Sequence, residues 1–191
     1  MVKLITFLGN PGPEHVSTRH NIAWMICQRL SFTNQLVWKS KFKGLYASHN
    51  ANDEKFILLK PQTYMNLSGE SVLPCINFFK IDIQDILVVH DELDFEFGRT
   101  ALKDGGGLAG HNGLRSIATT LGRQDFPRLR LGIGRPQHGS PHSFVLSSFN
   151  NDQQIDLDKI LDGAAEIVEY FMRHGLARSA TKYNKKNFIN E

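Results

Sequence analysis

Short apolar segments alternate with amphipathic segments along most of this chain. Four segments are apolar and rich in β-branched residues, which is typical of strands, and they cover residues 4–8, 56–59, 86–90 and 129–133. Between positions 36 and 48, apolar and polar residues alternate around Gly44. This pattern predicts two further strands separated by a break.

Apolar residues recur every three or four positions in the segments between the strands. This spacing predicts helices over residues 22–30, 65–79, 113–121 and 152–174. Gly69 and Pro74 lie inside the second of these segments, so we expect that helix to begin late or to bend. Strands that alternate with helices predict an α/β domain with a mixed or mainly parallel sheet.

Length and composition narrow the class of protein. The 191 residues are 41% hydrophobic and 21% charged, which is enough for a core without disulfides. We expect one domain over residues 1–191, with a flexible basic tail over residues 182–191. The apolar N-terminal segment is too short for a signal peptide, and no segment approaches the ~20 apolar residues of a membrane span. Cys27 and Cys75 suggest reduced thiols, so we expect a cytoplasmic protein.

The net charge of +3 is unevenly distributed. Residues 99–135 carry seven basic and two acidic residues, a net charge of +5, whereas residues 136–170 carry one lysine and six acidic residues, a net charge of −5. A chain polarised in this way fits either a solvated charged face or a surface that binds phosphate groups.

Candidate functional residues follow the predicted strands. In an open α/β sheet, ligands bind at the carboxyl ends of the strands. Asn10 follows the first strand in a tight turn, His20 lies near the start of the next helix, and Asp91 ends another strand. A carboxylate fixes the tautomer of an imidazole and raises its basicity, so His20 with Asp91 suits the activation of a water molecule. Each of the three residues also has a structural interpretation, as a cap, a turn residue or an ion-pair partner.

Other chemistries are less well supported by the residue spacing. The segment GGGLAGHNG (105–113) formally matches the dinucleotide pattern GxGxxG, but it does not follow a clean strand, and the chain has no GxxxxGK[ST]. His20, Asp91 and His111 match no established metal motif, so no metal is expected. Three asparagines offer uncharged donors and acceptors that suit an ester or amide carbonyl: Asn10, Asn66 and Asn112.

Five segments contain most of these polar residues: GNPGPEH…TRHN (9–21), KPQTYMNLSG (60–69), HDELD (90–94), GGGLAGHNG (105–113) and RLRLGIGRP (128–136). Their order and spacing, and the chain length, resemble those of the bacterial-type peptidyl-tRNA hydrolase family. The resemblance implies a monomeric three-layer α/β/α enzyme with a central mixed, mainly parallel twisted sheet and no metal, cofactor or obligate protein partner. It also implies hydrolysis of the ester between a peptide, or an N-blocked amino acid, and the 3′ end of tRNA, which returns the tRNA to translation.

The resemblance implies roles for individual residues as well. His20 corresponds to the general base, Asp91 to the carboxylate that orients it, and Asn10 to the residue that distinguishes blocked from free aminoacyl-tRNA. Six positions correspond to residues that bind the substrate or the tRNA: His15, Tyr64, Asn66, Asn112, Lys103 and Arg130. The last two match a basic pair for the 5′ phosphate of tRNA and belong to the segment of net charge +5.

The chain departs from the family pattern at a few positions. His15 stands where Tyr is usual, Ala23 where Gly is usual, and residues 108–109 interrupt a common His-Gly stretch. Ala101 stands where a second lysine is frequent, and Arg99 is the residue available to supply that charge. None of these positions belongs to the catalytic pair, so we expect activity. Two alternatives remain, an RNA-binding protein that has lost catalysis and a metallo-exopeptidase of similar shape.

Overall fold

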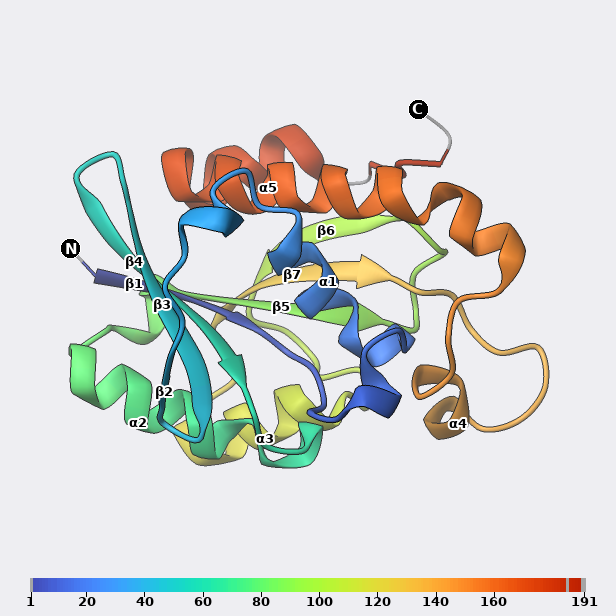
Figure 1. Cartoon of the computed structure of the whole chain (residues 1–191), viewed down its shortest axis with the longest axis horizontal. Coiled ribbons are helices and arrows are strands. Elements are labelled where there is room, and N and C mark those ends of the chain that lie inside the picture. The colour runs from blue at the N-terminus through green and yellow to red at the C-terminus, as the bar shows by residue number, and fades with distance from the viewer. Residues whose placement is uncertain (1, 185, 190–191) are drawn as a thin grey trace.

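Within residues 2–184 and 186–189, which the computed structural model describes, a mixed seven-stranded sheet forms the centre of the molecule (Figure 1). Its strands are β1 (Val2–Phe7), β2 (Lys39–Lys41), β3 (Gly44–Ala51), β4 (Glu54–Pro61), β5 (Ile86–Glu92), β6 (Thr100–Asp104) and β7 (Pro127–Gly132). They follow the order β2-β3-β4-β1-β5-β7-β6. Strands β4, β1, β5 and β7 are parallel, and the outer strands pair antiparallel, which confirms the predicted mixed, mainly parallel sheet.

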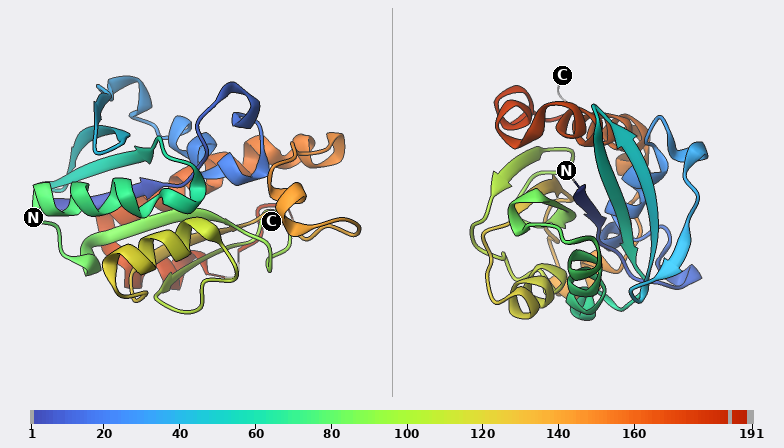
Figure 2. Two further views of the ribbon diagram at one scale, coloured as in Figure 1. Left: turned by 90° about the horizontal axis from the view of Figure 1, so that it is seen from below. Right: turned by 90° about the vertical axis from the view of Figure 1, so that its left-hand side faces the viewer.

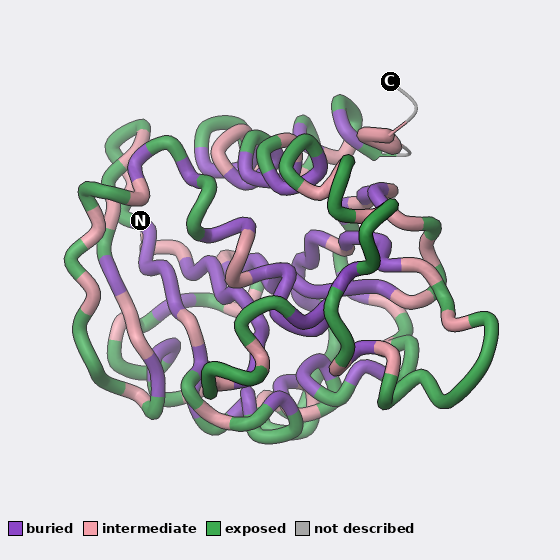
Figure 3. The backbone as a smooth tube through the Cα atoms, turned by 45° about the vertical axis from the view of Figure 1, so that its right-hand side comes forward, coloured by how far each residue is buried: buried purple, intermediate pink, exposed green. Residues whose placement is uncertain are grey.

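Helices cover both faces of this sheet (Figures 1 and 2). Helices α1 (Ile22–Gln28) and α5 (Asn151–Tyr183) lie on one face, α2 (Gly69–Phe79) and α3 (Asn112–Leu121) on the other, and the short α4 (Pro141–Val145) precedes α5. Alternation along β1 explains the two cores, because Ile5 and Phe7 pack with α1 and α5 while Leu4 packs with α2 and α3. The predicted three-layer α/β/α architecture is confirmed, with the central strands buried between the layers (Figure 3).

The predicted strands are all present, with ends that differ by a few residues. The break expected around Gly44 is a tight turn in which Phe42 and Lys43 adopt positive φ angles of 59° and 49°. Strand β6 was not predicted. It forms an edge of the sheet and leaves Lys103 and Asp104 exposed, so its sequence contains no continuous apolar segment.

The second predicted helix begins late, as expected. A single 3₁₀ turn, η4 (Met65–Leu67), precedes α2, which starts at Gly69 and contains Pro74. A Cβ atom at Gly69 would lie 2.6 Å from the backbone carbonyl oxygen of Ser116, so the glycine allows α2 and α3 to pack closely. Among the described residues, no helix combines the length and apolar character needed to cross a membrane.

Helix α5 extends beyond the predicted end at residue 174. Gly175 adopts a non-helical conformation (φ 74°), which breaks the helix into two parts, and the second part continues to Tyr183. Within the predicted tail, the side chain of Asn184 accepts from the backbone N–H of Leu102 at 2.6 Å and donates to its carbonyl at 3.0 Å, so this residue packs against β6. The backbone N–H of Thr100 also donates to Lys186, at 3.0 Å. Residues 185, 190 and 191 of the predicted tail lie outside the described residues.

Candidate active site

A cleft of about 1120 Å³ opens at the carboxyl ends of the central strands. Its lining comes from the segments that follow β1, β4 and β5, from the start of α3 and from α4. Seven of the nine site residues predicted from the sequence line it: Asn10, His15, His20, Tyr64, Asn66, Asp91 and Asn112. The structure therefore brings together side chains that are up to about a hundred positions apart in the sequence, since strands β1, β4 and β5 are neighbours.

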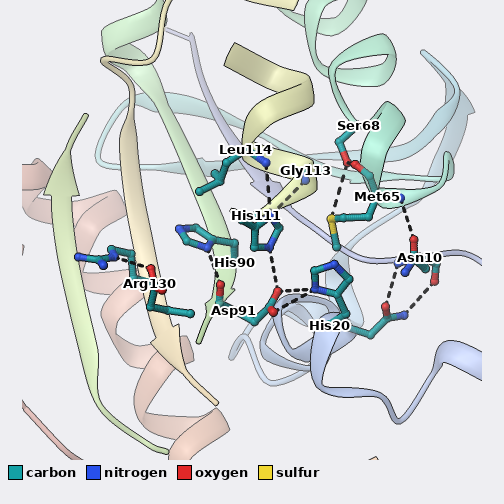
Figure 4. A network of polar contacts seen from close by, with 12 residues as sticks. Asn10, His20, Met65, Ser68, His90, Asp91, His111, Gly113, Leu114 and Arg130 are labelled. Atoms are coloured by element: carbon teal, nitrogen blue, oxygen red, sulfur yellow. Dashed lines mark hydrogen bonds and ion pairs between the residues drawn. The ribbon is translucent and has the colours of Figure 1, made fainter. Parts of the chain in front are cut away.

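His20 and Asp91, which both line this cleft, form a direct pair (Figure 4). His20 lies in the 3₁₀ turn η2 (Arg19–Asn21) before α1, and Asp91 lies near the end of β5. Nδ1 of His20 is 2.8 Å from Oδ1 and 3.0 Å from Oδ2 of Asp91. Because an ionised carboxylate only accepts hydrogen bonds, Nδ1 carries the proton and Nε2 keeps the free lone pair of a base.

His111 is a second imidazole on the same carboxylate. Its Nε2 lies 2.9 Å from Oδ1 of Asp91, and its Nδ1 accepts hydrogen bonds from the backbone N–H groups of Gly113 and Leu114 at 3.1 Å and 3.3 Å. Nδ1 therefore carries no proton, so His111 is neutral, donates from Nε2 and caps the N-terminus of α3. The sequence reasoning considered His111 only as a metal ligand. Its position directly before the predicted helix 113–121 was the signal for a cap.

The pKa values of the pair follow from burial and from mutual contact. Burial by itself would raise the pKa of Asp91, but the two imidazoles hold it well below its usual range. Burial by itself would lower the pKa of His20, but the charge of Asp91 and its hydrogen bond raise that pKa above the ordinary value of 6.5. Asp91 is therefore ionised, and His20 is a stronger base than a free imidazole.

The three groups His20, Asp91 and His111 each offer one donor atom within 4.8 Å of the others, which is close enough to consider a metal. The nitrogens that face the carboxylate are the ones that carry its hydrogen bonds, and Nδ1 of His111 is already used by α3. A metal ion bound to Nδ1 of His20 and Nε2 of His111 would have to displace the protons on both nitrogens. The other nitrogen of His111, Nδ1, is not available to the metal because it caps α3. The donor set thus fits a hydrogen-bonded base better than a metal centre.

His90 supports the same end of β5. Its Nδ1 donates to the backbone carbonyl of Asp91 at 2.7 Å, and its ring meets that of His111 edge-on with centroids 5.0 Å apart. Burial drives the pKa of His90 well below its ordinary value of 6.5. His90 is therefore neutral and packs behind the base rather than beside the cleft.

Asn10 is fixed by a ring of hydrogen bonds. The side chain of Asn21 accepts from the backbone N–H of Asn10 at 2.8 Å and donates to its carbonyl at 2.9 Å. The side-chain Oδ1 of Asn10 accepts from the backbone N–H of Met65 at 2.7 Å. Because its oxygen is occupied, Asn10 presents its NH₂ group as a donor. Asn21, the last residue of the TRHN motif, was not predicted to belong to the site.

The remaining predicted cleft residues have exposed or half-buried side chains. Tyr64 is 63% exposed, and Asn66 and Asn112 are exposed on η4 and at the start of α3. His15, at the end of the 3₁₀ turn η1 (Pro13–His15), lies 3.5 Å from the carboxylate of Glu14. These side chains are therefore available to contact a ligand in the cleft.

Lys103 and Arg130 lie outside the cleft lining, on strands β6 and β7. Arg130 pairs in register with Ala101, and Lys103 is two residues further along β6, so both cations project from the same face of the sheet. Arg130 donates to Glu92 at 3.0 Å, and Glu92 itself lines the cleft. The basic pair therefore lies on a surface that adjoins the cleft.

The structure shows the surroundings of three departures from the family pattern. The guanidinium groups of Arg99 and Arg130 lie 4.7 Å and 4.2 Å from the centroid of the same ring, that of Phe95. Arg99 is thus near the position expected of the missing second lysine. Ala23 is fully buried in the core with α5, and Ala109 adopts a positive φ of 47° in the glycine-rich loop.

Comparison with known proteins agrees with this geometry. Residues 4–191 match the family described as peptidyl-tRNA hydrolase. The chain is 48% identical to a peptidyl-tRNA hydrolase of Geotalea daltonii over 98% of its length and 99% of the relative's, and 44% identical to that of Geobacter sulfurreducens over 98% and 97%. The crystal structure of peptidyl-tRNA hydrolase from Acinetobacter baumannii superimposes with a TM-score of 0.87 at 36% identity, covering 98% of this chain and 96% of that one. With a match of this extent in sequence and in fold, the chain belongs to the peptidyl-tRNA hydrolase family.

Proposed function

We propose that this chain hydrolyses the ester bond between a peptide, or an N-blocked amino acid, and the 3′ end of tRNA in peptidyl-tRNA, so that the tRNA returns to translation. Membership of the family over nearly the whole chain supports this substrate class. One observation carries the reaction type: the imidazole of His20 lines the cleft, Asp91 holds its Nδ1, and its Nε2 has no hydrogen-bond partner among the described residues.

In the proposed reaction, Nε2 of His20 takes a proton from a water molecule as the water oxygen attacks the ester carbonyl. Asp91 stabilises the imidazolium that forms, because its carboxylate contacts Nδ1 at 2.8 Å and 3.0 Å. The bond to the 3′ oxygen of the ribose then breaks, and that oxygen recovers the proton from Nε2. The products are a free peptide acid and tRNA, and the base returns to its neutral state.

Asparagine amides recognise the acyl group in this proposal. The NH₂ group of Asn10 donates to the acyl group and distinguishes blocked from free aminoacyl-tRNA, since its Oδ1 is held by Met65. The exposed amides of Asn66 and Asn112 bind the peptide and the 3′ end from two other walls of the cleft. An amide donor near the carbonyl also stabilises the developing oxyanion.

The tRNA is held through its phosphates and its terminal base. Lys103 and Arg130 bind the 5′ phosphate from the face of β6 and β7, beside the cleft. Tyr64 and His15 offer rings on which the 3′ adenine can stack. Binding of this kind recognises the acceptor end by charge and shape and reads few bases.

We propose further that the enzyme works as a monomer, without a metal or another cofactor, in the cytoplasm. The catalytic pair and the described cleft lining lie within one chain, so the proposed reaction asks for no residue of a second copy. The hydrogen bonds of His20, Asp91 and His111 support water activation by imidazole alone. The cytoplasm is where translation produces the proposed substrate.

The test is the rate of hydrolysis of N-acetylaminoacyl-tRNA by the wild type and by His20→Ala. We expect the variant to lose roughly 10²- to 10⁴-fold in kcat, the contribution of a positioned base. His174→Ala is the matched control, because His174 is exposed on α5 and does not line the cleft. Unchanged turnover in His20→Ala would refute the mechanism. A wild type that binds tRNA without hydrolysis would support the RNA-binding alternative, and loss of activity in excess chelator would support a metalloenzyme.

A further inference from the structure

Arg19, the residue directly before His20, is a buried cation with an unusual set of partners. Its side chain is hidden from solvent, with the residue only 5% exposed. Nη1 donates to the backbone carbonyl and hydroxyl of Ser147 at 3.2 Å and 2.6 Å and to the carbonyl of Ser148 at 2.6 Å. Nη2 donates to Oε1 of Gln153 at 2.6 Å. The guanidinium thus hydrogen-bonds a single segment, residues 147–153, about 130 positions away in sequence.

All of these acceptors are neutral, and the described residues provide Arg19 with no ion pair. Its guanidinium instead lies 4.2 Å and 5.2 Å from the ring centroids of Phe144 and Phe149. Burying a cation without a carboxylate is costly, and here both Nη atoms offset part of that cost by donating hydrogen bonds, while the buried Nε has no partner among the described residues. Only a planar fork with several donors satisfies acceptors in this arrangement, so lysine is a poor replacement.

The segment that Arg19 holds is a wall of the cleft. It runs from α4 to the first turn of α5, and the residues of α4 and its end line the cleft with Pro141, His142, Val145 and Leu146. The backbone N–H of Arg19 also donates to the carbonyl of Ser147 at 3.0 Å. Gln153, the last acceptor, belongs to the capping box that starts α5. One side chain therefore joins the turn of the catalytic base, the α4 wall and the start of α5.

We propose that Arg19 is a positioning residue that holds the α4 wall at a set distance from His20, so that the peptide beyond the reacting acyl group is bound against this wall. The inference rests on the proposed function. His20 itself is held from the opposite side by Asp91, so its tautomer and basicity do not depend on Arg19. The apolar side chains of Val145 and Leu146, with Leu93, make this wall suited to peptide side chains. Loosening the wall should therefore weaken binding of the peptide and leave proton transfer intact.

The decisive variant is Arg19→Lys, which keeps the charge and loses the fork. We would compare N-acetylaminoacyl-tRNA with tRNA carrying a longer peptide, measuring kcat and KM separately. We expect kcat/KM to fall roughly tenfold on the longer substrate, through KM, and much less on the short one. The pH at which activity is half lost on the acid side should not move. Arg29→Gln is the matched control, because Arg29 is an exposed arginine that pairs with Asp158 and Asp162 on α5.

Equal losses on both substrates, a displaced pH midpoint, or no loss at all would overturn the proposal. Ser147→Ala is a milder variant that removes only the hydroxyl acceptor, and it should show the same dependence on peptide length if Arg19→Lys does not fold. Hydrogen exchange supplies a readout that needs no activity. Backbone amides of residues 142–147 should exchange faster in Arg19→Lys, and unchanged exchange there would contradict the proposal. A wild type inactive on both substrates would count against the proposed function instead.

Discussion

Replacing Asp91 by asparagine removes one charge from the centre of the site and keeps its shape. The carboxylate accepts from Nδ1 of His20 at 2.8 Å and 3.0 Å and from Nε2 of His111 at 2.9 Å. An asparagine whose oxygen takes the place of Oδ1 still serves both histidines. Its NH₂ group then faces the Nδ1 proton of His20, and because both groups are donors, no hydrogen bond forms between them. We therefore expect a folded protein in which the imidazolium of His20 has lost its counter-charge.

The size of the effect follows from these distances. Two unit charges 2.8 Å apart attract by roughly 6 kcal/mol at an effective dielectric constant of ~20, which is a ceiling because burial of the pair opposes it. A hydrogen bond to a charged group contributes ~1.5–3 kcal/mol net. His20 becomes charged as it removes the proton from water, so this amount is added to the barrier. The expected loss in kcat/KM is roughly 10- to 150-fold.

The pH dependence gives a second, independent measure. In the wild type, burial lowers the pKa of His20 and Asp91 more than compensates, so the pKa lies above 6.5. The base must be neutral, so kcat/KM should fall as the pH decreases through that pKa. In Asp91→Asn burial acts without the opposing charge, and the midpoint should move to lower pH.

The assay is kcat/KM on N-acetylaminoacyl-tRNA from about pH 5 to about pH 9, the range in which histidine titrates. Asp94→Asn is the control, because Asp94 belongs to the same HDELD motif but is exposed and pairs with Arg135. An Asp91→Asn variant within about threefold of the wild type, or with an unmoved midpoint, would refute the reasoning.

Three further predictions concern binding, stability and thiol reactivity. His111→Ala should lower the free energy of unfolding by about 1 kcal/mol in urea denaturation, because α3 loses its cap, and an unchanged midpoint would argue against that role. Lys103→Ala or Arg130→Ala should weaken tRNA binding and reduce the slope of log affinity against log salt by about 1, whereas an identical slope would exclude phosphate contact. Burial raises the pKa of Cys27 and of Cys75 to about 12. Neither thiol should therefore react with a disulfide reagent near pH 8 until the protein is unfolded in denaturant, and rapid reaction of the native protein would contradict their burial.

The central strands were predictable because each is buried on both faces. Strand β5 is buried along its whole length, so its apolar segment is visible in the sequence without any knowledge of its neighbours. Strand β6 pairs with a neighbouring strand on one side only, and two of its five residues are exposed, so its composition resembles that of a loop. The tail shows the same limit, because Asn184 is a polar residue whose contacts with β6 depend on a strand that the pattern did not predict.

Site residues were predictable where an ionisable or amide side chain stands near the end of a predicted strand or the start of a predicted helix. A histidine and a carboxylate near the ends of predicted elements suggested a base and its partner, and the structure brings them within 2.8 Å. The bond of His111 to Asp91 and the bonds of Arg19 to residues 147–153 were harder to assign, because each joins segments distant in sequence. The positions of Lys103 and Arg130 relative to the cleft likewise required the pairing of β6 with β7.

By itself the sequence determined the types and order of the central strands and of the longer helices, the α/β class and the residues able to carry acid–base chemistry. These follow from local periodicity and from the fixed chemistry of each side chain, and both act over a few residues. Only the tertiary structure decided that Asp91 serves two imidazoles and that Arg19 holds the α4 wall. Tautomer, pKa and wall position depend on distances and burial between strands and helices far apart in the chain, which no local pattern contains.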